Sequence, residues 1–263
     1  MDDLIGGESL GARRSLRFDI LTLFPKMFEP VLGESIPGRA RAAGLVSWKA
    51  WDIRDYAENK HNKVDDRPFG GGPGMVMYAE PLVRAVEAAE AESSDRAATR
   101  LLLTPQGEPL TQRVVEELSG LDRLLLIAGH YEGIDERAVE MLEPREISVG
   151  DFVLSGGELA AMALIDAVVR LLPGVLGHEA SAAEDSFAAR GPNGERLLDC
   201  PHYTRPRVWR GRAVPEVLLG GDHGAVAQWR LEQMLARTRA RRPDLLSPGS
   251  GSGGGGADGG EQG

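Results

Sequence analysis

The sequence predicts an α/β protein built on a parallel sheet, followed by a small helical C-terminal domain. Between residues 17 and 172, short apolar runs alternate with segments of helical periodicity, an order typical of strand–helix–strand units. Of the 263 residues, 42% are hydrophobic and 27% are charged, which is the balance of a globular protein with a sizeable core. Beyond residue 205 the chain becomes rich in arginine and helical in pattern, which sets its last part apart.

The expected strands are short, largely apolar runs that end at turn-forming residues. They are residues 17–24, 45–53, 100–103, 123–128 and 146–149. The expected helices have apolar residues at helical spacing, and they are residues 80–92, 111–119, 135–142 and 158–172. Residues 54–79 are expected to form a long, polar, glycine-rich loop.

The same pattern predicts the domain organisation. We expect a disordered leader over residues 1–15, an α/β domain over 16–176, an interdomain linker over 177–198 and a helical domain over 199–246. In the helical domain, residues 215–219 and 222–241 are expected to be helices. Residues 247–263 contain nine glycines and cannot bury enough apolar surface to offset their ordering entropy, so a disordered tail is predicted.

The composition excludes several classes of protein. A single cysteine, Cys200, leaves no disulfide framework and no multi-cysteine zinc site, and it favours a reducing compartment. No apolar run approaches the roughly 20 residues of a membrane span, and the acidic start does not resemble a signal peptide. Neither a P-loop nor a recognisable metal motif is present. We therefore expect a cytoplasmic protein without a membrane segment.

The charge is unevenly distributed. The whole chain has a net charge of −10, which argues against nucleic-acid binding. Residues 205–242, however, contain nine arginines against three carboxylates, a local charge of +6 over 38 residues. This basic segment indicates either a surface that binds nucleic acid or a solvated helix face, and composition alone leaves both open.

Three expected strands lead directly into polar, turn-forming loops, at residues 104–107, 129–133 and 150–158. Ligands bind to open α/β sheets outside the carboxyl ends of the strands, and glycines let the backbone approach a ligand closely. One such loop is explained by a tight turn alone, whereas three consecutive loops predict a ligand pocket.

Other features are open to more than one interpretation. Arg170 is the only charged residue between Asp166 and His178, so it either caps the end of an apolar helix or provides a cation at a site. Carboxylates gather in loops at residues 64–68 and 184–187. Cys200 is followed by proline, and we interpret it as structural rather than nucleophilic.

Several runs resemble bacterial tRNA (guanine-N1)-methyltransferases. They are residues 64–75 (VDDRPFGGGPGM), 131–137 (YEGIDER), 148–159 (SVGDFVLSGGEL), 173–181 (PGVLGHEAS), 184–187 (EDSF) and 197–206 (LLDCPHYTRP). They occur in the order of that family, and the resemblance covers about residues 17–245.

The resemblance implies a homodimeric SPOUT-class enzyme with a deep trefoil knot formed by the three loops above. Such an enzyme uses S-adenosylmethionine to methylate N1 of the guanosine just 3′ of a tRNA anticodon. General rules of topology argue against knots, so only the resemblance implies one here. It also implies a need for Mg²⁺.

By resemblance, Asp185 is the general base and Arg170 is the cation that stabilises charge on O6 of the guanine. The residues implied to hold S-adenosylmethionine lie in the three loops. They are Thr104, Pro105, Gln106, Gly129, Tyr131, Glu132, Val149, Gly150, Phe152, Leu154, Gly156 and Gly157. The residues implied to hold tRNA are Asp66 and Arg67 at the target base and Arg237, Arg239 and Arg241 at the phosphates. Asp185 lies in the expected linker, so it can come from the other subunit.

The chain departs from the family pattern at two pocket positions. His130 stands where the family more often has arginine, and Phe152 replaces a more usual tyrosine. Two alternatives to the implied function remain: a related SPOUT methyltransferase acting on ribosomal RNA, and a tRNA-binding protein without catalytic activity. The linker that carries Asp185 argues against the first alternative, and intact catalytic candidates argue against the second.

Overall fold

The computed structural model describes residues 15–177 and 185–246, and the predicted disordered ends lie outside these ranges except for Ser15. The chain divides into two compact units, Met1–Gly177 and His178–Gly263, and each is described by itself below. No helix in the described ranges has the length and apolar character needed to cross a membrane.

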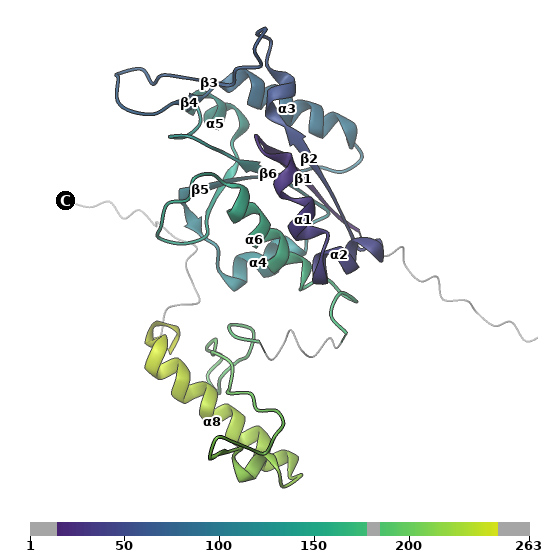
Figure 1. Ribbon diagram of the computed structural model, residues 1–263, viewed down its shortest axis with the longest axis vertical. Coiled ribbons are helices and arrows are strands. Elements are labelled where there is room, and N and C mark those ends of the chain that lie inside the picture. The colour runs from purple at the N-terminus through teal and green to yellow at the C-terminus, as the bar shows by residue number, and fades with distance from the viewer. Residues whose placement is uncertain (1–14, 178–184, 247–263) are drawn as a thin grey trace, which may run out of the picture. The chain divides into compact units, whose positions relative to one another are not determined.

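The first unit is built on a five-stranded sheet (Figure 1) with the strand order β2-β1-β6-β5-β7. All pairings between neighbouring strands are parallel, which confirms the predicted α/β fold with a parallel sheet. The strands are β1 (Leu16–Thr22), β2 (Val46–Asp52), β5 (Thr99–Pro109), β6 (Arg123–Ala128) and β7 (Arg145–Ser148).

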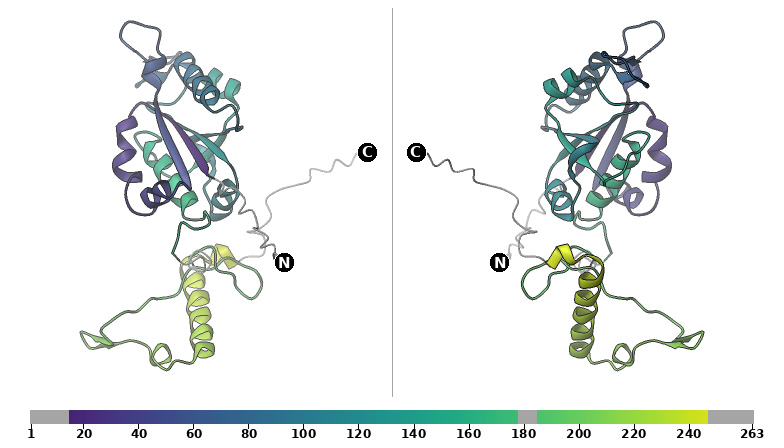
Figure 2. Two further views of the ribbon diagram at one scale, coloured as in Figure 1. Left: turned by 90° about the vertical axis from the view of Figure 1, so that its right-hand side faces the viewer. Right: turned by 90° about the vertical axis from the view of Figure 1, so that its left-hand side faces the viewer.

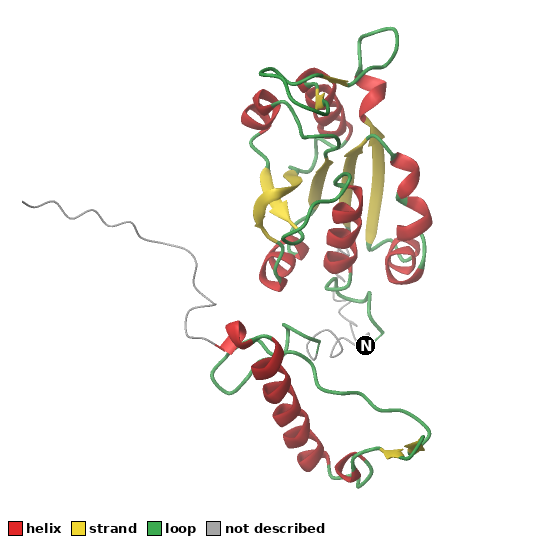
Figure 3. Cartoon of the chain, turned by 60° about the vertical axis from the view of Figure 1, so that its left-hand side comes forward, coloured by secondary structure: helices red, strands yellow, loops and turns green. Residues whose placement is uncertain are grey.

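Helices cover both faces of this sheet (Figure 3). They are α1 (Glu29–Leu32), α2 (Ser35–Ala42), α3 (Ala79–Glu92), α4 (Gln112–Ser119), α5 (Glu136–Leu142) and α6 (Glu158–Val169). Alternate residues of β6 point to opposite faces, as a pleated strand requires. Leu124 and Leu126 join a core cluster with Ile165 of α6, whereas Leu125 and Ile127 join a second cluster on the side of α3 and α5.

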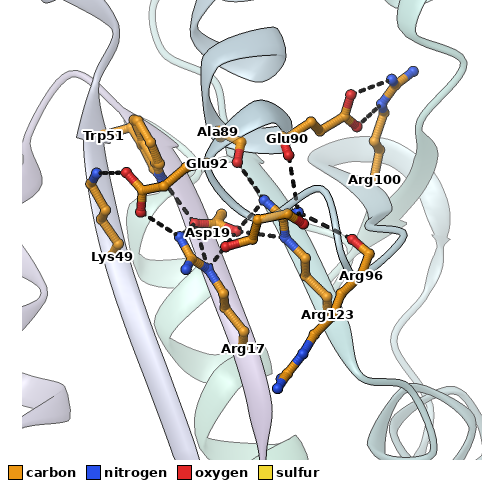
Figure 4. Close-up of polar contacts among 11 residues, drawn as sticks. Arg17, Asp19, Lys49, Trp51, Ala89, Glu90, Glu92, Arg96, Arg100 and Arg123 are labelled. Atoms are coloured by element: carbon orange, nitrogen blue, oxygen red, sulfur yellow. Dashed lines mark hydrogen bonds and ion pairs between the residues drawn. The ribbon is translucent and has the colours of Figure 1, made fainter.

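A buried ion pair links the central strands (Figure 4). Arg123 of β6 is 1% exposed and donates from Nε to Oδ2 of Asp19 in β1, at 2.8 Å. Trp51 of β2 donates from its indole nitrogen to Oδ1 of Asp19, at 3.0 Å. Arg123 also donates to the carbonyl oxygens of Ala89 and Ser93 at the end of α3, which satisfies backbone acceptors that a helix C-terminus leaves open.

Six short elements in the described part of the first unit were not expected from the sequence. Helices α1 and α2 lie between the first two strands, where prolines and glycines interrupt the apolar pattern. Within the expected loop over 54–79, β3 (Asp65–Asp66) and β4 (Val76–Met77) form a small antiparallel ribbon. The turns η1 (Pro25–Met27) and η2 (Ile53–Tyr56) follow β1 and β2.

The second unit contains one long helix, α8 (His223–Arg241), visible in both views of Figure 2. Asp222 caps this helix by accepting from the backbone N–H of Ala225, at 3.0 Å. The unit also holds β8 (Val208–Trp209), β9 (Arg212–Ala213), η3 (Glu216–Leu218) and η4 (Pro243–Leu246). Part of the expected linker packs within this unit, since Leu198 donates its N–H to Oγ1 of Thr238 in α8, at 2.9 Å.

Candidate functional site

A pocket of about 400 Å³ lies beside the middle of β5 and at the carboxyl ends of β6 and β7. The loops that follow β6 and β7 line it, together with the first turn of α6 and residues 102–106, so the expected loop over 104–107 is an irregular part of β5. Its volume falls within the range of small-molecule sites, and its position is the one where open α/β sheets bind ligands. The structure therefore places a pocket where the three consecutive loops predict one.

All twelve residues predicted to hold a cofactor line this pocket. They are Thr104, Pro105, Gln106, Gly129, Tyr131, Glu132, Val149, Gly150, Phe152, Leu154, Gly156 and Gly157. They come from three segments that are separated by helices in the sequence, and only the parallel order of β6, β5 and β7 brings them together. What they bind is not fixed by this arrangement and stays a prediction.

The pocket loops depend on close backbone packing. The pairing of β5 with β7 breaks between Leu103 and Glu108, and the residues between them bulge out of the sheet toward the pocket. Gly157 donates its N–H to the carbonyl oxygen of Gly129, at 2.7 Å. A Cβ on Gly157 would lie 2.8 Å from Cα of Ala128, so a side chain at this position would separate the two loops.

A buried polar cluster borders the pocket. Glu158, the first residue of α6, is 2% exposed and accepts from the Thr22 hydroxyl at 2.8 Å. Nδ1 of His130 lies 3.6 Å from Oε2 of Glu158, is buried, and has no hydrogen-bond partner among the described residues. The His130 ring packs between Phe24 and Tyr131, with centroid distances of 5.0 and 5.3 Å.

Sequence reasoning missed Glu158 and noted His130 only as a departure from a family pattern. A buried carboxylate at the start of an apolar helix has the same sequence signal as an acidic residue in the first turn of an exposed helix. The signal that could have revealed it is the pair of glycines at Gly156 and Gly157, because they remove the side chains that would otherwise fill the space beside it.

Comparison with known proteins identifies the family. Residues 16–248 match the model of the tRNA (guanine-1)-methyltransferase TrmD family. The chain belongs to this family. A tRNA (guanine-N(1)-)-methyltransferase of Dechloromonas aromatica is 55% identical over 88% of this chain and 91% of its own length. A protein of the same name from Halorhodospira halophila is 55% identical over 90% of this chain and 87% of its own length. Another from Rhodopirellula baltica is 54% identical over 88% of this chain and 94% of its own length.

Membership of the tRNA (guanine-1)-methyltransferase family confirms the predicted family and the prediction of an enzyme. It also covers both units, because the matched residues extend through α8. The roles of individual residues in this methyltransferase are not given by the match, so the positions of the remaining candidates matter.

Arg170 lies at the end of α6 that is far from the pocket. It follows Val169 with helical backbone angles and donates its N–H to the carbonyl oxygen of Asp166, at 3.2 Å. At 1.5 Å per residue, about 20 Å of helix separates it from Gly157. Arg170 does not line the pocket of its own chain, and Asp185 belongs to the second unit.

The predicted target-base residues lie on the ribbon and loop before α3. Asp66 accepts from the Tyr78 hydroxyl and from the Arg67 N–H, both at 2.8 Å. The pKa of Asp66 lies below its usual value. The main cause is the Arg67 N–H, followed by the Tyr78 hydroxyl and Lys63, and the carboxylate is charged near neutral pH. The loop adjoins the pocket, because Glu132 donates its N–H to the carbonyl oxygen of Met75 at 3.0 Å.

The three arginines predicted at the tRNA phosphates differ in their surroundings. Arg237 is half-buried and donates to the carbonyl oxygen of Asp199 at 3.2 Å, so it also holds α8 against the preceding segment. Arg239 and Arg241 are exposed in the last turn of α8. A cation there is stabilised by the helix dipole whether or not it binds RNA.

One group of residues in the described ranges could hold a metal ion, namely Asp199, Cys200 and His202. Burial, then the neighbouring Asp199 carboxylate, raises the pKa of the Cys200 thiol. A protonated, buried thiol fits the structural interpretation of this cysteine. A sulfur and an imidazole do not suit Mg²⁺, which prefers oxygen ligands.

Proposed function

We propose that the protein transfers a methyl group from S-adenosylmethionine to N1 of the guanosine just 3′ of a tRNA anticodon. The observation that carries this proposal is one pocket that gathers all twelve predicted cofactor residues in a chain of the tRNA (guanine-1)-methyltransferase family. Because its substrate is tRNA, we place the enzyme in the cytoplasm.

The pocket residues suit S-adenosylmethionine. The cofactor supplies an electrophilic methyl group on its sulfonium. Glycine-rich loops offer backbone N–H and carbonyl groups to the polar edge of an adenine, and they let the backbone approach closely. Tyr131, Phe152 and Leu154 provide apolar contact area at the rim, since each is at least 36% exposed.

The target nitrogen needs a base, because N1 of guanine carries a proton at neutral pH. Asp185 is proposed to accept that proton. An ordinary aspartate, with a pKa of about 3.9, is a weak base for so weak an acid. A guanidinium beside O6 stabilises the deprotonated guanine and so lowers the pKa of N1 toward that of the aspartate. This is the proposed role of Arg170.

The proposed site needs two copies of the chain. Ala160 is the last residue of α6 that lines the pocket, and Arg170 lies about 15 Å further along the helix, which is beyond the reach of its side chain. A second copy can place its Arg170 and Asp185 at that pocket. Exposed apolar residues beside the pocket support a homodimer, since Val153 is 85% exposed and Leu159 is 55% exposed.

We also propose that the three pocket loops form the trefoil knot of the SPOUT class. Support comes from the tight approach of the second and third loops, where Gly157 donates to Gly129 and His130 pairs with Gly156. The loop carrying Asp66 and Arg67 is proposed to hold the target base after it leaves its stack, and the arginines of α8 to contact phosphates. No step is assigned to Mg²⁺.

The test is transfer of labelled methyl from S-adenosylmethionine to RNA. A tRNA transcript with guanosine 3′ of the anticodon should become labelled at N1, and the same transcript with adenosine there should not. Labelling of ribosomal RNA instead would favour the related SPOUT activity. Binding of tRNA without labelling of any RNA would favour a non-catalytic tRNA-binding protein.

A further inference from the structure

The second unit carries an exposed hairpin that the proposed function does not yet use. Strands β8 and β9 pair Val208 with Ala213 and Trp209 with Arg212, and the hairpin lies away from α8 in the views of Figures 2 and 3. Val208 is 58% exposed and Trp209 is 56% exposed. An indole that open to solvent costs free energy unless a partner covers it.

The hairpin is also strongly basic. Residues 201–215 contain four arginines and no aspartate or glutamate. These arginines are Arg205, Arg207, Arg210 and Arg212. All four are exposed, and none forms an ion pair with a residue in the described ranges. Elsewhere in the described chain, arginines such as Arg17, Arg123 and Arg145 have carboxylate partners. The hairpin thus presents unneutralised positive charge around an exposed aromatic ring.

The turn of the hairpin holds an arginine where the backbone favours another residue. Arg210 and Gly211 have φ angles of +48° and +76°, as a two-residue turn between twisted strands requires. Asparagine, aspartate or glycine fits the first of these positions with less strain. The Arg210 guanidinium lies 5.0 Å from the centroid of the Trp209 ring, which adds a second flat, π-facing group to the indole.

We propose that the hairpin Val208–Ala213 binds tRNA, with an unpaired base stacked on Trp209 and phosphates contacted by the surrounding arginines. This inference rests on the proposed function, since it names the element that recognises the RNA substrate. Exposed aromatic rings interleaved with arginine are the means by which proteins bind unpaired nucleotides. Four arginines without carboxylate partners attract the closely spaced phosphates of RNA and repel the same hairpin of a second copy, which favours RNA as the partner.

The experiment measures binding of the full-length protein to a tRNA transcript over a range of salt concentrations. Trp209→Ala should weaken affinity roughly 5- to 150-fold, the range found for removal of one base–aromatic stack. Its salt dependence should stay unchanged, because an indole displaces no counterion. Trp209→Tyr should restore most of the affinity, since the ring is retained.

Arg210→Asn separates the charge from the turn. Asparagine suits the backbone at this position, so the hairpin should stay folded while the salt slope falls by up to about one unit. Arg242→Asn is the matched control, because it removes the same charge from the same unit at an arginine already paired with Asp244 at 2.7 Å. We expect the control to bind tRNA nearly as the parent does.

Two results would overturn the inference while leaving the proposed function intact. One is a Trp209→Ala variant that binds tRNA within twofold of a parent that methylates it. The other is sedimentation showing that Trp209→Ala dissociates the dimer, which would assign the hairpin to contact between copies. A parent that binds no tRNA would overturn both proposals together. Calorimetry with S-adenosylmethionine should give parental affinity for every hairpin variant.

Discussion

Nδ1 of His130 and Oε2 of Glu158 lie 3.6 Å apart, and Gly156 occupies the space against both side chains. His130 belongs to the second pocket loop, and Glu158 begins the helix that follows the third. Their approach therefore sets how closely the two loops lie. A Cβ on Gly156 would overlap Nδ1 of His130 and Oε2 of Glu158, so only glycine leaves this approach undisturbed.

Gly156→Val should abolish binding of S-adenosylmethionine while the protein stays folded. The added side chain displaces His130 and Glu158 and alters the pocket, whereas the core clusters lie elsewhere. Calorimetry measures the binding, and circular dichroism checks the fold. Gly177→Val is the matched control, because a Cβ there meets nothing within 4 Å and its backbone is not in the left-handed region. Normal binding by Gly156→Val would show that the cofactor site lies elsewhere.

Asp19→Ala should lower the free energy of unfolding by about 3–5 kcal/mol, because it leaves the buried Arg123 guanidinium without its carboxylate. Urea unfolding measures the change. Arg137→Ala removes an exposed arginine from a pair with Asp135 and should cost much less, because solvent screens an exposed ion pair. Equal effects of the two substitutions would mean that the buried network contributes no more than a surface pair.

Asp185→Asn should lower the rate of methyl transfer about 10²- to 10⁴-fold, since asparagine keeps the shape but cannot accept a proton. Binding of S-adenosylmethionine and tRNA should change little. The measurement is a single-turnover assay with both substrates saturating. If Asp185 only caps a turn, asparagine would serve as well, and a rate within about threefold of the parent would remove it from the mechanism.

Mixing two inactive variants tests whether the site is shared between subunits. A mixture of Asp185→Asn protein with Gly156→Val protein should regain activity if one copy supplies the pocket and the other copy supplies the base. No recovery from mixed dimers would mean that each site is built from one chain.

Arg239→Gln with Arg241→Gln should weaken tRNA binding and flatten its salt dependence. The slope should fall by up to about one unit for each phosphate that an arginine no longer neutralises. Binding measured over several salt concentrations gives the slope. Arg237→Gln should in addition destabilise the second unit, because Arg237 donates to the carbonyl oxygen of Asp199. An unchanged slope in the double variant would identify Arg239 and Arg241 as a solvated helix face.

The long periodic elements were predictable, because hydrophobic spacing reports which side chains face a core. The strand over 123–128 and the helix over 80–92 match β6 and α3 within one residue at each end. Helices α1 and α2 were not predicted, because Pro30, Pro37 and three glycines between residues 33 and 44 interrupt the spacing and tertiary packing decides their form. The order of the strands was also beyond a local pattern, since pairing joins residues far apart in the chain.

The pocket was predictable from its loops, but its chemistry was only partly so. Thr104, Gly129 and Gly150 each follow a short apolar run of the sequence, and that local signal is enough to place them together at the pocket. The distance of Arg170 from the pocket follows from helix length once α6 is known to touch the pocket by its first turn. The burial of Glu158 depends on neighbours from β1 and β6, so apart from the two glycines before it the sequence does not separate it from a surface carboxylate.

The strand order has a consequence for synthesis on the ribosome. β1 lies between β2 and β6, and Asp19 meets Arg123 across 104 positions of sequence. At roughly 5–20 residues per second, β6 emerges about 5–20 s after β1. During that interval β1 can pair only with β2, and β5 has been made before either of its neighbours. The nascent chain therefore exposes one edge of β1 until β6 is complete at residue 128, and one edge of β5 until β7 is complete at residue 148.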